Sequence, residues 1–209
     1  TKTDAEHRRV LREVEERLRT AGLSVNREKS RYSQEEVDYL GFTIDKDGIR
    51  PSRKKAARLR QAHPPERMGH LSHFIGAFSF YSRFIRGASK ILAPLHEITK
   101  AHMEEKARRG RARTITKEAI IEWTDERLAA FKAAAEAFAS DNTLAFPRTG
   151  APTRVATDAC EVSIGGALEQ DHRQEGAREA HWAPVDFHSE KIQKGDAYLS
   201  PYHKEMFAI

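Results

Sequence analysis

Apolar residues recur at helical spacing in the first part of the chain. Four of them fall on one helical face: Val10, Leu11, Val14 and Leu18. Thr3 and Glu6 have the spacing of a capping box ahead of that face, and Gly22 provides a stop signal behind it. The pattern predicts an amphipathic helix between Thr3 and Gly22, followed by a short extended piece at residues 23–25.

The pattern then changes to that of β-strands. Residues 37–44 predict one continuous strand, and Asp47 followed by Gly48 is a tight-turn signal that returns the chain into residues 49–50. Pro51 closes this unit. A β-hairpin is therefore expected after the first helix.

Helical signals dominate the next stretch. Ser52 predicts an N-cap for a basic helix that ends before Pro64 and Pro65. The charges of this helix are Arg53, Lys54, Lys55, Arg58 and Arg60. Residues 68–85 predict a helical stretch rich in aromatic side chains, and residues 91–98 predict a further short helix.

A basic segment then interrupts the apolar pattern. Residues 101–118 are rich in Lys and Arg and have almost no large apolar group, which predicts a linker or a flexible loop. Trp123 opens a new unit. One apolar helical face follows it: Leu128, Phe131, Ala135 and Phe138.

The last part of the chain has the pattern of a β-sheet followed by a helix. Three strands are predicted at residues 153–159, 162–169 and 181–188. Residues 171–176 predict a polar hairpin tip. Ser200 is a good N-cap and Pro201 suits the first helical position, so a helix is expected to begin there.

Two carboxylates stand out in this last part. Asp158 lies within an otherwise apolar strand pattern. Glu205 flanks the expected apolar stripe of the last helix, made by Tyr202, Met206 and Ile209. Paired carboxylates hold the metal ions of metal-dependent nucleases. A strand-end acid and an exposed helix residue are the alternative interpretations.

Composition sets limits on the class of protein. The chain has 209 residues, of which 39% are hydrophobic and 32% are charged, as in a soluble globular protein. The net charge of +5 favours a polyanionic partner, with an acidic substrate as the alternative. The single cysteine, Cys160, excludes an internal disulfide framework and suits a reducing, intracellular compartment. No apolar run approaches the roughly 18 residues of a membrane span.

Several motifs, in order along the chain, resemble the reverse transcriptases of Ty3/gypsy-type retrotransposons. The motifs similar to the end of the palm and to the thumb are residues 21–29, 37–42, 48–51, 74–76, 81–85 and 93–95. The motifs similar to the connection and the RNase H-like domain are residues 122–124, 131, 157–159 and 202–208. The ordered set, rather than any one motif, carries the resemblance.

The resemblance implies an α+β fold. It places the C-terminal part of the palm, with its helix and β-hairpin, at residues 1–50, and a helical thumb at 51–100. A basic linker or insertion follows at 101–121. Residues 122–209 are then the connection and the N-terminal half of an RNase H-like domain, an antiparallel sheet with its first helix.

The activity implied by the resemblance is that of a retroelement polyprotein. Such a protein synthesises DNA from an RNA template and hydrolyses the RNA of RNA–DNA hybrids. The Tyr/Phe-x-Asp-Asp turn of the polymerase centre and the last two RNase H acids are absent from this sequence. The isolated chain is therefore expected to be inactive.

The resemblance also assigns catalytic roles. Asp158 and Glu205 match the first two of the four RNase H acids and would be ligands of Mg²⁺, in a site that this chain leaves incomplete. Lys29 matches a lysine that approaches the incoming nucleotide and protonates the departing pyrophosphate. An ordinary solvated loop lysine is the alternative for Lys29.

Nucleic-acid contacts are expected at two places. The residues that resemble the primer grip are Tyr39, Leu40, Gly41 and Phe42, although ordinary hairpin packing explains Leu40 and Phe42 equally well. The basic helix offers Arg53, Lys54, Lys55 and Arg58 to the phosphates of an RNA–DNA hybrid or duplex. A solvated helix face is the alternative for that helix.

Two other functions stay open. One is a non-catalytic nucleic-acid-binding protein derived from a retroelement. The other is a generic basic α+β adaptor in which Asp158 and Glu205 are structural. The separation of these two carboxylates would discriminate the adaptor from the nuclease.

Overall fold

The computed structural model has an α+β fold, as the sequence predicted. It describes residues 3–110, 112, 114–138, 143–173, 176, 178–192 and 200–207. The chain divides into two compact units, Thr1–Glu35 and Glu36–Ile209. No helix among the described residues is long and apolar enough to cross a membrane.

The first unit contains the predicted amphipathic helix α1, Asp4–Thr20. The Thr3 side chain accepts a hydrogen bond from the Glu6 N–H at 3.2 Å, which confirms the predicted cap. Gly22 has φ of 75°, and the Leu23 N–H bonds the Leu18 carbonyl at 2.9 Å, so the helix ends in a Schellman-type turn. Residues 23–25 form no strand.

A three-stranded antiparallel sheet opens the second unit. Its strands are β1 (Val37–Tyr39), β2 (Phe42–Ile44) and β3 (Ile49–Pro51), in that order. The prediction of one strand over residues 37–44 was wrong, because Leu40 and Gly41 adopt φ of 50° and 89° and reverse the chain. Two successive residues with positive φ make the two-residue turn whose twist suits a hairpin.

The helical part follows. It comprises α2 (Arg53–Arg60), α3 (Met68–Phe80), the 3₁₀ turn η1 (Ser82–Phe84), α4 (Ala88–Arg108) and α5 (Asp125–Glu136). Its core contains fully buried side chains from four of these elements: Leu71, Phe78, Phe84, Leu95 and Phe131. Most of the aromatic positions that gave residues 68–85 their helical pattern therefore build the core, whereas Phe80 is 55% exposed.

Helix α4 corrects the prediction for the basic segment. It runs without interruption to Arg108, so the first part of the expected linker is helical. Its last turns consist mainly of good helix formers, and Arg109 pairs with Glu105 one turn earlier at 2.5 Å. A high density of charge therefore lengthens the helix here instead of ending it.

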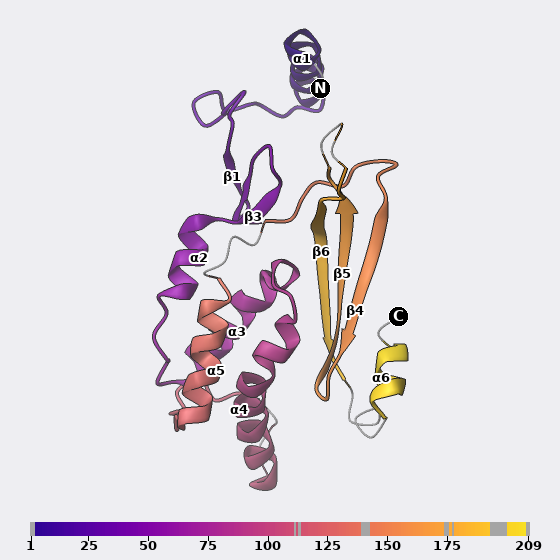
Figure 1. Ribbon diagram of the computed structural model, residues 1–209. Coiled ribbons are helices and arrows are strands. Elements are labelled where there is room, and N and C mark those ends of the chain that lie inside the picture. The colour runs from indigo at the N-terminus through magenta and orange to yellow at the C-terminus, as the bar shows by residue number, and fades with distance from the viewer. Residues whose placement is uncertain are drawn as a thin grey trace. The chain divides into compact units, whose positions relative to one another are not determined.

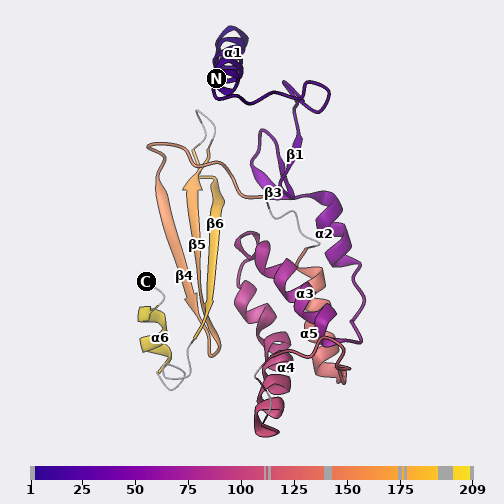
Figure 2. The same cartoon turned by 180° about the vertical axis from the view of Figure 1, so that it is seen from behind.

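The second sheet matches its prediction closely. Strands β4 (Thr153–Ala159), β5 (Ser163–Asp171) and β6 (Trp182–Lys191) pair antiparallel in that order, with an irregularity between Leu168 and Glu169. Helix α6, Pro201–Phe207, contacts β4 and β5, and Figures 1 and 2 show it beside β4 from both sides. The Ser200 hydroxyl accepts from the His203 N–H at 3.4 Å, which confirms the predicted helix start.

The helical part is joined to the second sheet through β6. Ser89, in the first turn of α4, donates through its N–H to the Ser189 hydroxyl at 3.1 Å and through its own hydroxyl to the Ser189 carbonyl at 2.8 Å. Lys191 pairs with Glu97 at 2.7 Å. These contacts fix the start of α4 against the end of the sheet that carries Asp158.

Candidate nucleic-acid interface and metal site

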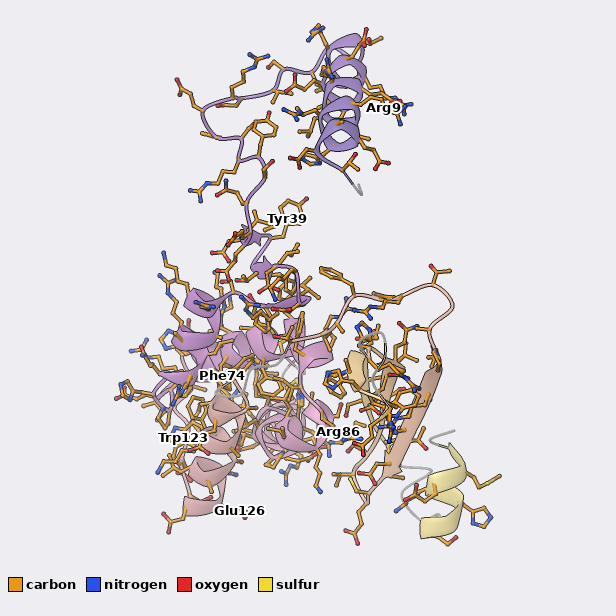
Figure 3. The ribbon with its side chains drawn as sticks, turned by 45° about the horizontal axis from the view of Figure 1, so that its top comes forward. Arg9, Tyr39, Phe74, Arg86, Trp123 and Glu126 are labelled. Carbon is orange, nitrogen blue, oxygen red and sulfur yellow. The ribbon has the colours of Figure 1, made fainter. Side chains whose placement is uncertain are left out.

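The predicted primer-grip residues lie at the tip of the β1–β2 hairpin. Tyr39 and Leu40 are 61% and 72% exposed, and Figure 3 shows Tyr39 at this hairpin. Phe42 turns inward instead and stacks on Phe80, with ring centroids 5.2 Å apart. The hairpin therefore presents two apolar side chains to solvent while a third anchors it.

The Gly41 carbonyl fixes this tip. It accepts hydrogen bonds from the Ser52 N–H at 2.9 Å and from the Tyr81 hydroxyl at 3.1 Å. A β-carbon on Gly41 would lie 2.9 Å from the Tyr81 oxygen, so the close approach requires glycine as much as the positive φ does. Burial raises the pKa of Tyr81, so its hydroxyl stays a proton donor.

The basic helix α2, which carries the predicted phosphate contacts, starts beside the Gly41 carbonyl. Ser52 is the N-cap of α2, so the basic helix starts one hydrogen bond away from the hairpin turn. Its four predicted contacts are all exposed: Arg53, Lys54, Lys55 and Arg58. Lys54 and Arg58 are four residues apart and share a face. Arg53 lies 3.6 Å from Glu36, an exposed pair of little energetic weight.

Lys29 belongs to the first unit, Thr1–Glu35. Its side chain is exposed, and its backbone N–H donates to the Asn26 side-chain oxygen at 3.1 Å. The Asn26 side chain thus shapes the turn that presents Lys29 to solvent.

The two predicted metal ligands come from neighbouring elements. Asp158 lies on β4 opposite Gly165 of β5, and Glu205 lies on α6, which contacts both strands. Both side chains are exposed. Met206 is 57% exposed, so the expected buried stripe of α6 is not formed at that position. The Tyr202 side chain and Ile209 lie outside the described residues.

Asp158 lines a cavity of about 190 Å³ between the second sheet and the start of α4. The cavity is also lined by Arg86 and Lys90, and Glu205 is not among its lining residues. The structure gathers no group of three or more His, Cys, Asp or Glu side chains that could hold a metal within the described ranges. The sequence prediction missed Arg86 and Lys90, because no local pattern links them to Asp158.

The pKa of the Cys160 thiol, which lines this cavity, is lowered by its surroundings. Burial raises the pKa of its thiol, but hydrogen bonds from the Ser163 hydroxyl and from the backbone outweigh that effect. The positive charge of Lys90 acts in the same direction, and the net result is a pKa below the ordinary cysteine value. The hydrogen bonds and Lys90 therefore favour the charged form of this thiol.

The C-terminal part of the chain is similar to a known domain family. Residues 123–209 match the family model of the RNase H-like domain found in reverse transcriptase. The matched part of the chain holds α5, the second sheet and α6.

The whole chain is similar to retroelement polyproteins. It is 29% identical over 204 residues to the retrovirus-related Pol polyprotein from transposon opus of Drosophila melanogaster, covering 97% of this chain and 19% of that protein. It is 24% identical over 209 residues to the transposon Tf2-3 polyprotein of Schizosaccharomyces pombe, covering 100% and 14%. The chain thus spans less than a fifth of these relatives. The resemblance to Ty3/gypsy-type retrotransposon polyproteins is confirmed.

Solved structures show the same fold. The foamy viral protease-reverse transcriptase dRH in complex with double-stranded DNA superposes with a TM-score of 0.77 at 21% identity, covering 100% of this chain and 33% of that chain. The foamy viral protease-reverse transcriptase in complex with an RNA/DNA hybrid gives 0.75 at 21% identity, covering 100% and 25%. The chain therefore shares the fold of the corresponding part of these two solved proteins.

Proposed function

We propose that this chain holds nucleic acid within a polyprotein that synthesises DNA on RNA and hydrolyses the RNA of the hybrid. The observation that carries the proposal is the Gly41 carbonyl, which joins the exposed hairpin tip, the N-cap of α2 and Tyr81 of the helical part. A grip on a flexible duplex requires apolar and cationic groups held in one fixed geometry. These three elements supply that geometry.

The basic helix α2 supplies the cations of this grip. Its exposed Lys54, Lys55 and Arg58 can neutralise backbone phosphates without reading sequence. The hairpin tip adds Tyr39 and Leu40, whose apolar surface can rest against the end of a strand. The phosphate contacts of α2 then determine the affinity for nucleic acid, and the hairpin positions the end of the strand.

The RNase H-like domain supplies the second activity in this proposal. Asp158 and Glu205 offer carboxylate oxygens, the donors that Mg²⁺ prefers, from two elements in contact. The bound metal would activate water and stabilise the leaving oxygen. The protein's own part is to present both carboxylates from a sheet and a helix that hold them in place.

A non-catalytic nucleic-acid-binding role is the second candidate. The cavity beside Asp158 contains the cations Arg86 and Lys90, which oppose a metal ion by charge repulsion. This observation favours a domain that holds a strand over one that cuts it. The two functions differ in whether Asp158 is needed for binding or for cleavage.

Separate variants of the parent polyprotein test the nuclease. Asp158→Asn and Glu205→Gln should each reduce Mg²⁺-dependent cleavage of an RNA–DNA hybrid by more than about a hundredfold, because charge stabilisation of the transition state is lost. Primer extension should continue in both. Glu161→Gln, which removes an exposed acid just beyond β4, is the matched control. Cleavage at the control rate in both variants would favour the non-catalytic role.

Lys29 is tested by the complementary measurement. Lys29→Gln should slow primer extension by the parent polyprotein and leave hybrid cleavage unchanged, because a proton donor for pyrophosphate serves only synthesis. Equal rates of extension with and without the substitution would assign Lys29 to the solvated loop.

A further inference from the structure

The cavity between the helical part and the second sheet has two chemically different walls. Arg86, Gly87 and Lys90 line it from the helical side, and the strands β4, β5 and β6 line it from the other. Figure 3 shows Arg86 between the helical part and the sheet. Its volume of about 190 Å³ equals that of roughly six water molecules in the liquid, so a small anion fits.

Among the residues that the structure describes, Arg86 and Lys90 differ from nearby Arg83 in having no acidic partner. Arg83 pairs with Asp186 at 3.3 Å. Within the described ranges, no ion pair joins Arg86 or Lys90 to a carboxylate, although Asp158 lines the same cavity. Two cations and one carboxylate leave an excess positive charge, which an added anion would compensate.

The floor of the cavity is open because β5 carries two glycines there. A β-carbon on Gly165 would come no closer than 3.7 Å to another atom, and one on Gly166 no closer than 4.0 Å. The absence of side chains at Gly165 and Gly166 therefore leaves space in the cavity and does not serve a close contact between backbones. Hydroxyl groups of Ser163 and Ser189 line the cavity and can serve as hydrogen-bond donors to an anion.

We propose that this cavity binds a phosphate group of a nucleic-acid backbone between Arg86 and Lys90. The inference rests on the proposed nucleic-acid-binding function and locates a contact within it, at the junction of the helical part and the second sheet. Guanidinium and ammonium groups are the usual protein donors to backbone phosphates. The Ser89–Ser189 hydrogen bonds hold the two walls at this spacing.

The charge variant Arg86→Gln/Lys90→Gln tests the cations. Binding of the full chain to an RNA–DNA hybrid is measured by fluorescence anisotropy over a range of salt concentrations, in EDTA so that metal binding and cleavage play no part. The slope of log affinity against log salt should fall by about two units if both side chains meet phosphates. Lys117→Gln/Lys132→Gln removes the same charge from exposed positions outside the cavity and should leave the slope nearly unchanged. Equal slopes for the two double variants would overturn the proposal.

Two single variants separate the cavity from general electrostatics. Gly165→Val fills the space without changing charge and should weaken hybrid binding, whereas unchanged binding by a variant with normal circular dichroism would overturn the proposal. Asp158→Asn should strengthen binding in EDTA by about twofold to fivefold, the range for an exposed like-charge contact. Weaker binding would overturn it as well. A metal-ligand role for Asp158 predicts loss of cleavage in Mg²⁺, so failure of the two proposals can be distinguished.

A competition experiment distinguishes a backbone phosphate from free inorganic phosphate as the ligand of the cavity. Inorganic phosphate is titrated against the hybrid at constant ionic strength, with sulfate-free chloride as the balancing salt. If the cavity binds a backbone phosphate, free phosphate replaces only one of several contacts that hold the hybrid. Displacement of the hybrid is then expected only at millimolar or higher phosphate. Displacement at micromolar phosphate would show a site for the free ion and overturn the backbone assignment.

Discussion

Removing the Tyr81 hydroxyl should loosen the hairpin without disturbing the core. In Tyr81→Phe the ring keeps its contacts with Phe42 and Phe138, whose centroids lie 5.8 Å and 6.1 Å away. Only the 3.1 Å hydrogen bond to the Gly41 carbonyl is lost. That carbonyl keeps its 2.9 Å bond from the Ser52 N–H, so it does not become an unsatisfied buried acceptor.

The free-energy change follows from this remaining partner. A hydrogen bond contributes about 0.5–1.5 kcal/mol net, and the larger penalty of about 1–3 kcal/mol applies only when a buried group is left unpaired. We therefore expect a loss of about 1 kcal/mol in the free energy of unfolding. For a chain of this size the corresponding decrease in Tm is about 2–4 °C.

Chemical denaturation monitored by circular dichroism measures this change. Tyr39→Phe is the matched control, because Tyr39 is 61% exposed and its substitution should alter stability by less than about 0.5 kcal/mol. Hybrid affinity should also decrease in Tyr81→Phe, since the hairpin tip and the N-cap of α2 lose their shared anchor. Stability of Tyr81→Phe equal to that of the control, together with hybrid affinity equal to that of the unsubstituted chain, would refute the role given to the Gly41 carbonyl.

Two further predictions concern stability. Gly48→Ala should lower the free energy of unfolding by at least about 3 kcal/mol, because its β-carbon would lie 2.1 Å from the Leu144 carbonyl oxygen. The control in the same denaturation assay is Gly150→Ala, because Gly150 has a positive φ but open space around it. Hydrogen bonds from Lys191 and then Lys100 lower the pKa of Glu97, so its stabilising effect is present above the ordinary Glu pKa of about 4.3 and is lost as pH falls through the lower folded value. Glu97→Gln should therefore lose less Tm than the unsubstituted chain on acidification, and identical Tm–pH profiles would contradict the assignment.

Local signals were sufficient for several elements. The caps at Thr3, Ser52 and Ser200 were predictable because a cap depends on a few adjacent residues. The strand at residues 153–159 was predictable to the residue, since its β-branched residues and the turn signals on either side of it are local in the sequence. These features set the class of fold before any tertiary contact is considered.

Features that depend on distant contacts were not predictable. Leu40 gives no local signal for positive φ, and the apolar run around it has the pattern of a single strand. Its turn is fixed by Gly41, whose carbonyl is held by Ser52 and by Tyr81, forty residues away. The motif resemblance located Asp158, but its neighbours Arg86 and Lys90 become visible only when α4 packs beside the sheet.

The salt dependence of hybrid affinity tests whether α2 and the hairpin together grip nucleic acid. Four of the exposed α2 residues would be replaced by Gln: Arg53, Lys54, Lys55 and Arg58. A control would replace four exposed arginines of α1: Arg8, Arg9, Arg12 and Arg19. If each α2 charge neutralises a phosphate, the slope of log affinity against log salt should fall by about three to four units in the α2 variant and by less than about one in the control. An unchanged slope in the α2 variant would contradict the proposed grip, because it would show that α2 neutralises no phosphate.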